Sequence, residues 1–74
     1  MEAKLSKLLK AAQDKYEAQK SEALAHLEIL FEKSVGIGEH TDILSEIDKW
    51  LASLSAAEEN LYQLNQHFGG GDES

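Results

Sequence analysis

The feature that most constrains this chain is an interruption at Gly36 and Gly38, the only glycines before residue 69. The segments on either side, residues 3–34 and 42–68, contain neither glycine nor proline, and helix-favouring residues dominate the first of them. A glycine just after a helix can adopt the left-handed conformation that satisfies the last carbonyl groups. The sequence therefore predicts an all-α fold, in which two helices form an antiparallel hairpin.

We expect the hairpin to occupy residues 1–68, with helices at about 3–34 and 41–67 and a turn at 35–41. Acidic and glycine-rich residues 69–74 are too polar to pack and predict a disordered tail. The predicted turn residues have separate roles: a C′ glycine, an apolar residue that packs back on the first helix, a second glycine and an N-cap hydroxyl. In that order they are Gly36, Ile37, Gly38 and Thr41.

Apolar residues in the first helical segment recur at an average of about 3.6 residues, which is the period of a straight helix. The predicted inward row is Leu5, Leu9, Ala12, Tyr16, Gln19 or Lys20, Ala23, Leu27, Leu30 and Ser34. The row is thinnest in its middle, where small and polar residues replace leucine. Small residues at these positions allow two helices to approach closely.

The second segment has a more regular pattern, with spacings that alternate between four and three residues as in a coiled coil. The predicted seam is Ile43, Ile47, Trp50, Leu54, Ala57, Leu61, Leu64 and Phe68. In an antiparallel hairpin, residues whose numbers sum to about 75 should lie opposite each other. Lys15 is then expected near the acidic residues Glu58 and Glu59, where exposed ion pairs would favour the antiparallel orientation.

Several large apolar residues fall beside these rows, where one neighbouring helix cannot cover them. The predicted interface residues are Leu8, Leu24, Phe31, Leu44 and Leu51, together with the large indole of Trp50. A contiguous exposed apolar patch of this kind marks an interface. We expect two hairpins to pair through it as a homodimer, which would form a four-helix bundle.

The formal net charge of −7 and the absence of arginine exclude the clustered positive charge that binds nucleic acids or anionic membranes. Residues 35–74 carry all of the excess, with eight acids against Lys49, whereas residues 1–34 carry six of each sign. No apolar run reaches the roughly 18 residues of a membrane span, and no signal-peptide core follows Met1. With no cysteine either, the sequence favours a cytoplasmic protein.

The sequence offers no recognisable catalytic or metal chemistry, so we expect neither enzymatic activity nor a bound cofactor. The histidines at positions 26, 40 and 67 lack helical metal-ligand spacing, apart from Glu22 with His26. Neighbouring carboxylates such as Glu58 and Glu59 point in different directions on a helix and cannot share a proton. The Gly-x-Gly of the turn follows no strand and precedes no Lys-Ser/Thr, so it does not predict a phosphate loop.

The turn sequence Val35-Gly36-Ile37-Gly38-Glu39-His40, with Asp42 two residues later, precedes an acidic helix that ends near Phe68. In this respect residues 22–68 resemble small acidic helical proteins encoded by tailed phages of T4-like and marine types. The resemblance implies a phage or host setting. It implies no particular activity, because such proteins have no assigned function.

Two functions are compatible with these features. The first is a protein-interaction module, a homo-oligomeric acidic hairpin that binds a protein partner, either directed at a host protein or imitating nucleic acid. The alternative is an oligomeric sponge that binds a nucleotide or another small ligand in pockets between subunits. Tyr16, Trp50, Tyr62 or His40 would line those pockets.

Overall fold

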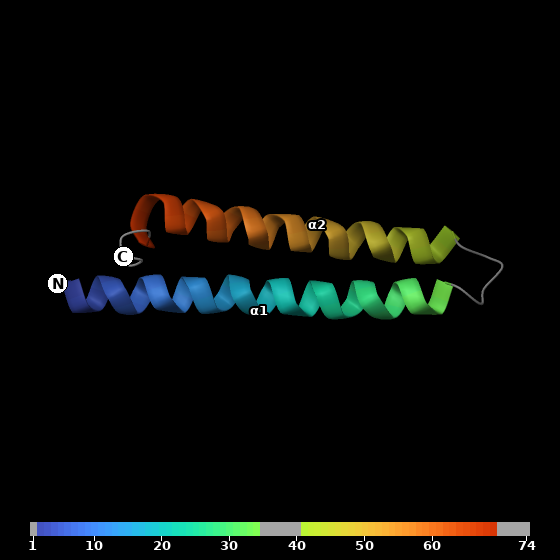
Figure 1. The fold of residues 1–74 in the computed structure, drawn as a ribbon, viewed down its shortest axis with the longest axis horizontal. Helices are drawn as coiled ribbons and strands as arrows, with labels where there is room; N and C mark the ends of the chain where they lie inside the picture. Colours follow the sequence, from blue (N-terminus) through green and yellow to red (C-terminus); the bar gives the residue numbers. More distant parts are fainter. Residues whose placement is uncertain (1, 35–40, 70–74) are drawn as a thin grey trace.

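The computed structural model describes residues 2–34 and 41–69, so the predicted turn residues Gly36, Ile37 and Gly38 and the predicted tail beyond residue 69 lie outside the described residues. Two long helices, α1 (Glu2–Ser34) and α2 (Thr41–Leu64), are followed by a short π-helix, η1 (Asn65–Gly69). The helices run side by side in opposite directions, and the start of α1 extends beyond the end of the second helical segment at the same end of the molecule (Figure 1). The predicted all-α hairpin of two packed helices is confirmed.

The helix ends carry the charges that the helix dipole favours. Lys33 lies in the last turn of α1, near the partial negative charge of the carbonyl end. Asp42 lies in the first turn of α2, near the partial positive charge of the amide end. α2 begins at Thr41, and the side chain of this predicted N-cap lies outside the described residues.

Three contacts fix the alignment of α1 against α2 plus η1. They join Gln13 to Asn65, Gln19 to Ser53, and His26 to Trp50. The numbers of each pair add to values near the predicted 75, as expected for antiparallel helices. The molecule is accordingly long and narrow, with extents of 56 × 18 × 16 Å, and each helix has a single neighbour.

The core between the helices is thin. Among the side chains that the structure describes, four apolar ones are buried, namely those of Ala23, Leu27, Ala57 and Leu61. Two of these residues are alanines, which bring the backbones close together. The remaining described members of the predicted inward rows are half-buried, with one exception described below. No large side chain among the described residues is less than 2% exposed. A single hairpin therefore covers little of its apolar surface.

The end of the second helix differs from the prediction. The heptad pattern placed Phe68 on the inward seam, but this side chain is 71% exposed. The reason is the change to π-helix at Asn65, because hydrogen bonds between residues i and i+5 widen the turn and alter the direction of the following side chains. Gly69, which was predicted to begin the disordered tail, ends the π-helix and takes the buried position instead.

The hairpin has two halves along its length. The proximal half, close to residues 35–40, comprises residues 20–33 of α1 and 42–56 of α2. The terminal half comprises residues 7–19 of α1 with 57–69 of α2 and η1.

Candidate functional site

An apolar groove lies between the two helices in the proximal half. It has a volume of about 630 Å³ and is open to solvent. The residues that line it come from both helices: Leu24, Leu27, Glu28, Phe31, Leu51 and Leu54. Three of these side chains are about half exposed, with values of 47% for Leu24, 54% for Phe31 and 48% for Leu51. Glu28 is the one charged group in the lining.

The groove residues belong to rows that repeat every seven residues, which is close to two helical turns. Leu24 and Phe31 form such a pair on α1, and Leu51 forms one on α2 with Leu44, which is 59% exposed. Continued by seven residues into the terminal half, the α1 row reaches Glu17 and the α2 row reaches Glu58. The same side of the hairpin therefore changes from apolar to acidic at the boundary between the halves.

The structure brings together some of the predicted interface residues and separates others. Leu24, Phe31 and Leu51 line one groove, and Leu44 lies on the same side of α2 as Leu51. Leu8 is 66% exposed, but sixteen residues separate it from Leu24. At 100° per residue this separation places the two side chains about 160° apart around α1. Leu8 thus does not extend the groove.

Trp50, the remaining predicted interface residue, stacks on His26 of the opposite helix. The ring centroids are 3.9 Å apart and the planes are within 3° of parallel. The ammonium of Lys49 lies 5.0 Å from the centroid of the Trp50 ring, within range of a cation–π interaction. The apolar pattern did not predict this stack, although the rule that opposite positions sum to about 75 could have paired His26 with Trp50.

A side-chain amide joins the helices near the middle of the hairpin. The Nε2 group of Gln19 donates to the backbone carbonyl of Ser53 at 3.1 Å and lies 3.4 Å from the Ser53 hydroxyl. The contact is partly buried. The predicted inward position of Gln19 is thereby explained, since its polar group bonds the partner helix in place of solvent.

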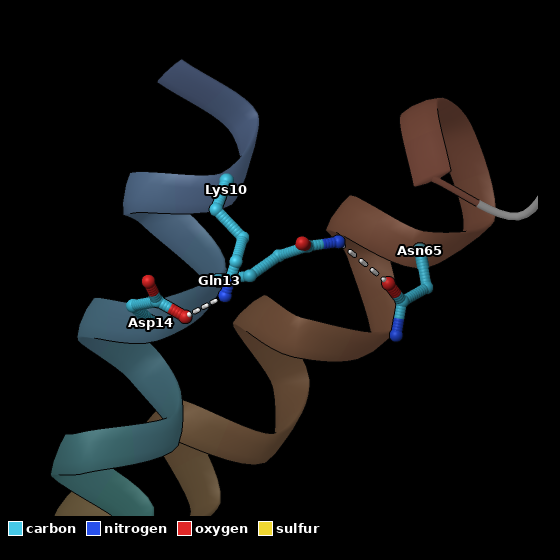
Figure 2. Close-up of polar contacts among 4 residues, drawn as sticks. All are labelled: Lys10, Gln13, Asp14 and Asn65. Atoms are coloured by element: carbon cyan, nitrogen blue, oxygen red, sulfur yellow. Dashed lines mark hydrogen bonds and ion pairs between the residues drawn. The ribbon is translucent and has the colours of Figure 1, made fainter. Parts of the chain in front are cut away.

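In the terminal half, polar groups close the gap between the helices. The Nε2 group of Gln13 donates to Oδ1 of Asn65 at 3.2 Å, as Figure 2 shows. A Cβ atom added at Gly69 would lie 3.1 Å from Gln13 Nε2 and 3.2 Å from Asn65 Oδ1. The buried glycine therefore leaves room for this interhelical bond.

A smaller pocket of about 200 Å³ also lies in the terminal half, lined by Tyr16, Asn60, Gln63, Leu64, His67 and Phe68. On its rim, the Nε2 group of Gln63 donates to Glu59 at 2.9 Å, and Nε2 of His67 lies 3.1 Å from Oε1 of Gln63. The residues expected for a ligand sponge are not gathered here. Of them, only Tyr16 lines this pocket, whereas Trp50 stacks on His26 and Tyr62 is 57% exposed. His40 lies outside the described residues.

Ion pairs contribute little between the helices. The predicted pairing of Lys15 with Glu58 or Glu59 is wrong for the described part of the chain, where the one ion pair joins Lys10 to Asp14 at 2.7 Å within α1 (Figure 2). The Lys15 ammonium lies 5.4 Å from the centroid of the Tyr16 ring instead. Contact with the adjacent ring satisfies the ammonium locally without the entropy cost of an exposed interhelical pair.

Within residues 2–34 and 41–69, no three His, Cys, Asp or Glu side chains are grouped closely enough to hold a metal ion. Neither long helix has a stretch that combines the length and the apolar character needed to cross a membrane. Comparison with protein-family models, curated proteins and solved structures found no match to this chain. The likeness of the turn sequence to phage proteins therefore stays a prediction.

Proposed function

We propose that this protein is a non-enzymatic protein-interaction module, an acidic α-hairpin that self-associates and presents its outer faces to a protein partner. The observation that carries the proposal is the open apolar groove lined by both helices in the proximal half. Apolar side chains that are exposed next to one another are a feature of association sites in proteins. Tyr16, Trp50 and Tyr62, which were expected to line the pockets of a small-ligand sponge, do not line this groove.

The energy available from covering the groove supports self-association. Full burial of a leucine or phenylalanine side chain contributes about 1.5–3 kcal/mol, so each half-exposed groove residue offers roughly 1 kcal/mol. The half-exposed side chains are those of Leu24, Phe31 and Leu51. A dimer would bury all three in both copies. The sum is on the order of the 5–15 kcal/mol that stabilises an entire small domain. Because four apolar residues are buried among those whose side chains the structure describes, this contribution is large.

The charge distribution supports a basic surface on the protein partner. The chain carries a net charge of −7, and α2 contains five acidic residues against Lys49. An acidic face of this kind attracts positively charged surfaces over a distance set by the ionic strength. The partner would bind the outer face of the hairpin, away from the groove that the second copy covers.

Sedimentation equilibrium of matched variants tests self-association. The wild-type chain of 8.2 kDa should have about twice its own mass at micromolar concentration. Leu24→Glu places a charge in the groove and should yield a monomer. Ile29→Glu is the matched control, because Ile29 is 56% exposed on the same helix but does not line the groove.

Circular dichroism shows whether each variant retains its helices, so loss of folding is not mistaken for loss of assembly. A monomeric wild type would overturn the self-association, as would equal weakening by Leu24→Glu and Ile29→Glu. The effect of added salt distinguishes a second copy in the groove from a basic partner in the groove. Two chains of charge −7 should associate more tightly as salt screens their repulsion, whereas a basic partner bound in the groove would be released.

A further inference from the structure

We infer that the groove is occupied by the same groove of a second copy, in an antiparallel dimer whose overlap is confined to the two proximal halves. This inference rests on the self-association proposed above and specifies its geometry. The two-fold axis would cross the hairpin near the centre of the groove, at the level of Glu28 on α1 and Ile47 on α2. The terminal halves of the two copies would then point in opposite directions.

The groove has the form that pairing with a second copy requires. Leu24 and Phe31 on α1 repeat at the same seven-residue spacing as Leu44 and Leu51 on α2. Each hairpin therefore presents two matching apolar rows, with Leu27 and Leu54 at the floor between them. A two-fold interface uses one patch on both copies, so the half-exposed side chains of each row can pack into the groove of the other copy. A separate partner with a complementary surface is not needed to cover the groove.

The acidic ends of the rows distinguish the two possible orientations. In a parallel dimer, the terminal halves would lie side by side, and Glu17 and Glu58 of one copy would face the same two residues of the other. Four carboxylates would then come together at the end of an apolar interface, where repulsion is poorly screened. In the antiparallel dimer, the overlap ends before Glu17 and Glu58, so these four carboxylates stay in water. Glu28 of each copy then lies near the two-fold axis, so two carboxylates rather than four approach each other.

The orientation can be measured with spin labels, because the chain has no cysteine of its own. Gln66 is an exposed residue near the end of the terminal half. It lies about 28 Å along the helix axis from the level of Ile47, at 1.5 Å per residue. Two labels at Gln66→Cys should therefore be about 55 Å apart in the antiparallel dimer. A parallel bundle would bring them within about 35 Å, given helix diameters of 10–12 Å.

The experiment is double electron–electron resonance on the full chain, with sedimentation equilibrium on the same labelled samples. The control is Glu32→Cys, an exposed position in the proximal half, whose labels should lie within about 35 Å in either orientation. A dimeric mass with a Gln66 distance near 55 Å would support the antiparallel dimer. A dimeric mass with a short Gln66 distance would overturn this geometry and leave the proposed function standing. A monomeric mass without a measurable distance would overturn both.

Discussion

The proximal and terminal halves of the hairpin are built from the same two helices and each has buried apolar residues, but they differ in the contacts beside that core. In the proximal half, leucines and Phe31 surround an open apolar groove. In the terminal half, the side-chain bond between Gln13 and Asn65 joins the helices, and the buried Gly69 lies beneath it. The exposed apolar residues of the terminal half, Leu8, Tyr62 and Phe68, do not line a common groove.

The comparison shows that the same seven-residue spacing carries apolar side chains in one half of the hairpin and acidic side chains in the other. On α1, the seven-residue row of Leu24 and Phe31 continues to Glu17 in the terminal half. On α2, the row of Leu44 and Leu51 continues to Glu58. Acidic residues at these positions keep this side of the terminal half solvated, so the apolar groove does not continue into it. In the proximal half, the apolar side chains of these rows remain exposed to solvent in a single hairpin. We therefore propose that self-association involves the proximal half.

The largest effects are expected from shortening a core leucine in each half. Leu27 is 5% exposed and Leu61 is 8% exposed, so substitution by alanine should destabilise the fold by about 2–5 kcal/mol in both cases. Leu27 also lines the groove, so Leu27→Ala should weaken self-association, whereas Leu61→Ala should not. Urea denaturation and sedimentation measure the two properties. Equal weakening of self-association by both variants would contradict the division into halves.

A smaller effect is expected from the aromatic stack in the proximal half. His26→Ala removes the ring that lies 3.9 Å from Trp50 and should cost about 0.5–1.5 kcal/mol. Because Trp50 is the only tryptophan, its fluorescence reports on the stack directly and should change. His67→Ala is the control in the terminal half and should leave the emission unchanged. An unaltered emission spectrum in His26→Ala would argue against the stack.

The smallest effect is expected from the polar contact of the terminal half. Gln13→Ala removes the 3.2 Å bond to Asn65, and because both side chains are exposed or nearly so, the loss should be about 0.5 kcal/mol. Lys10→Ala breaks the neighbouring ion pair with Asp14 within α1 and should cost less still. Thermal melting compares them. A loss above about 2 kcal/mol in Gln13→Ala would show that this bond, rather than the core, holds the terminal half.

The sequence was sufficient to predict the hairpin and most of its inward surface. Periodicity depends on which residues share a helical face, and it correctly placed Ala23, Leu27, Ala57 and Leu61 between the helices. It also identified Leu24, Phe31 and Leu51 as apolar residues beside the rows, and these three line the groove. Periodicity is a local property, so it can be evaluated without knowledge of the other helix.

Features that depend on the other helix or on departures from α-helical geometry were not predicted. The π-helix from Asn65 turns Phe68 outward and buries Gly69. The residue pattern of this stretch does not predict the change from α-helix to π-helix. The His26–Trp50 stack depends on axial alignment to within about one residue. Leu8 was grouped with Leu24 because both lie beside the row, but they lie on opposite flanks of it. The prediction considered only whether a residue was next to the inward row, and not on which side of the row it lay.

We propose that a second copy of the chain covers the groove of the proximal half. The concentration dependence of the melting temperature tests this proposal most directly, because association stabilises the folded state by mass action. Between about 1 and 100 µM, the melting temperature of the wild type should rise, and that of Leu24→Glu should stay constant. A wild-type transition that is independent of concentration over this range, with an 8.2 kDa sedimentation mass, would contradict the account.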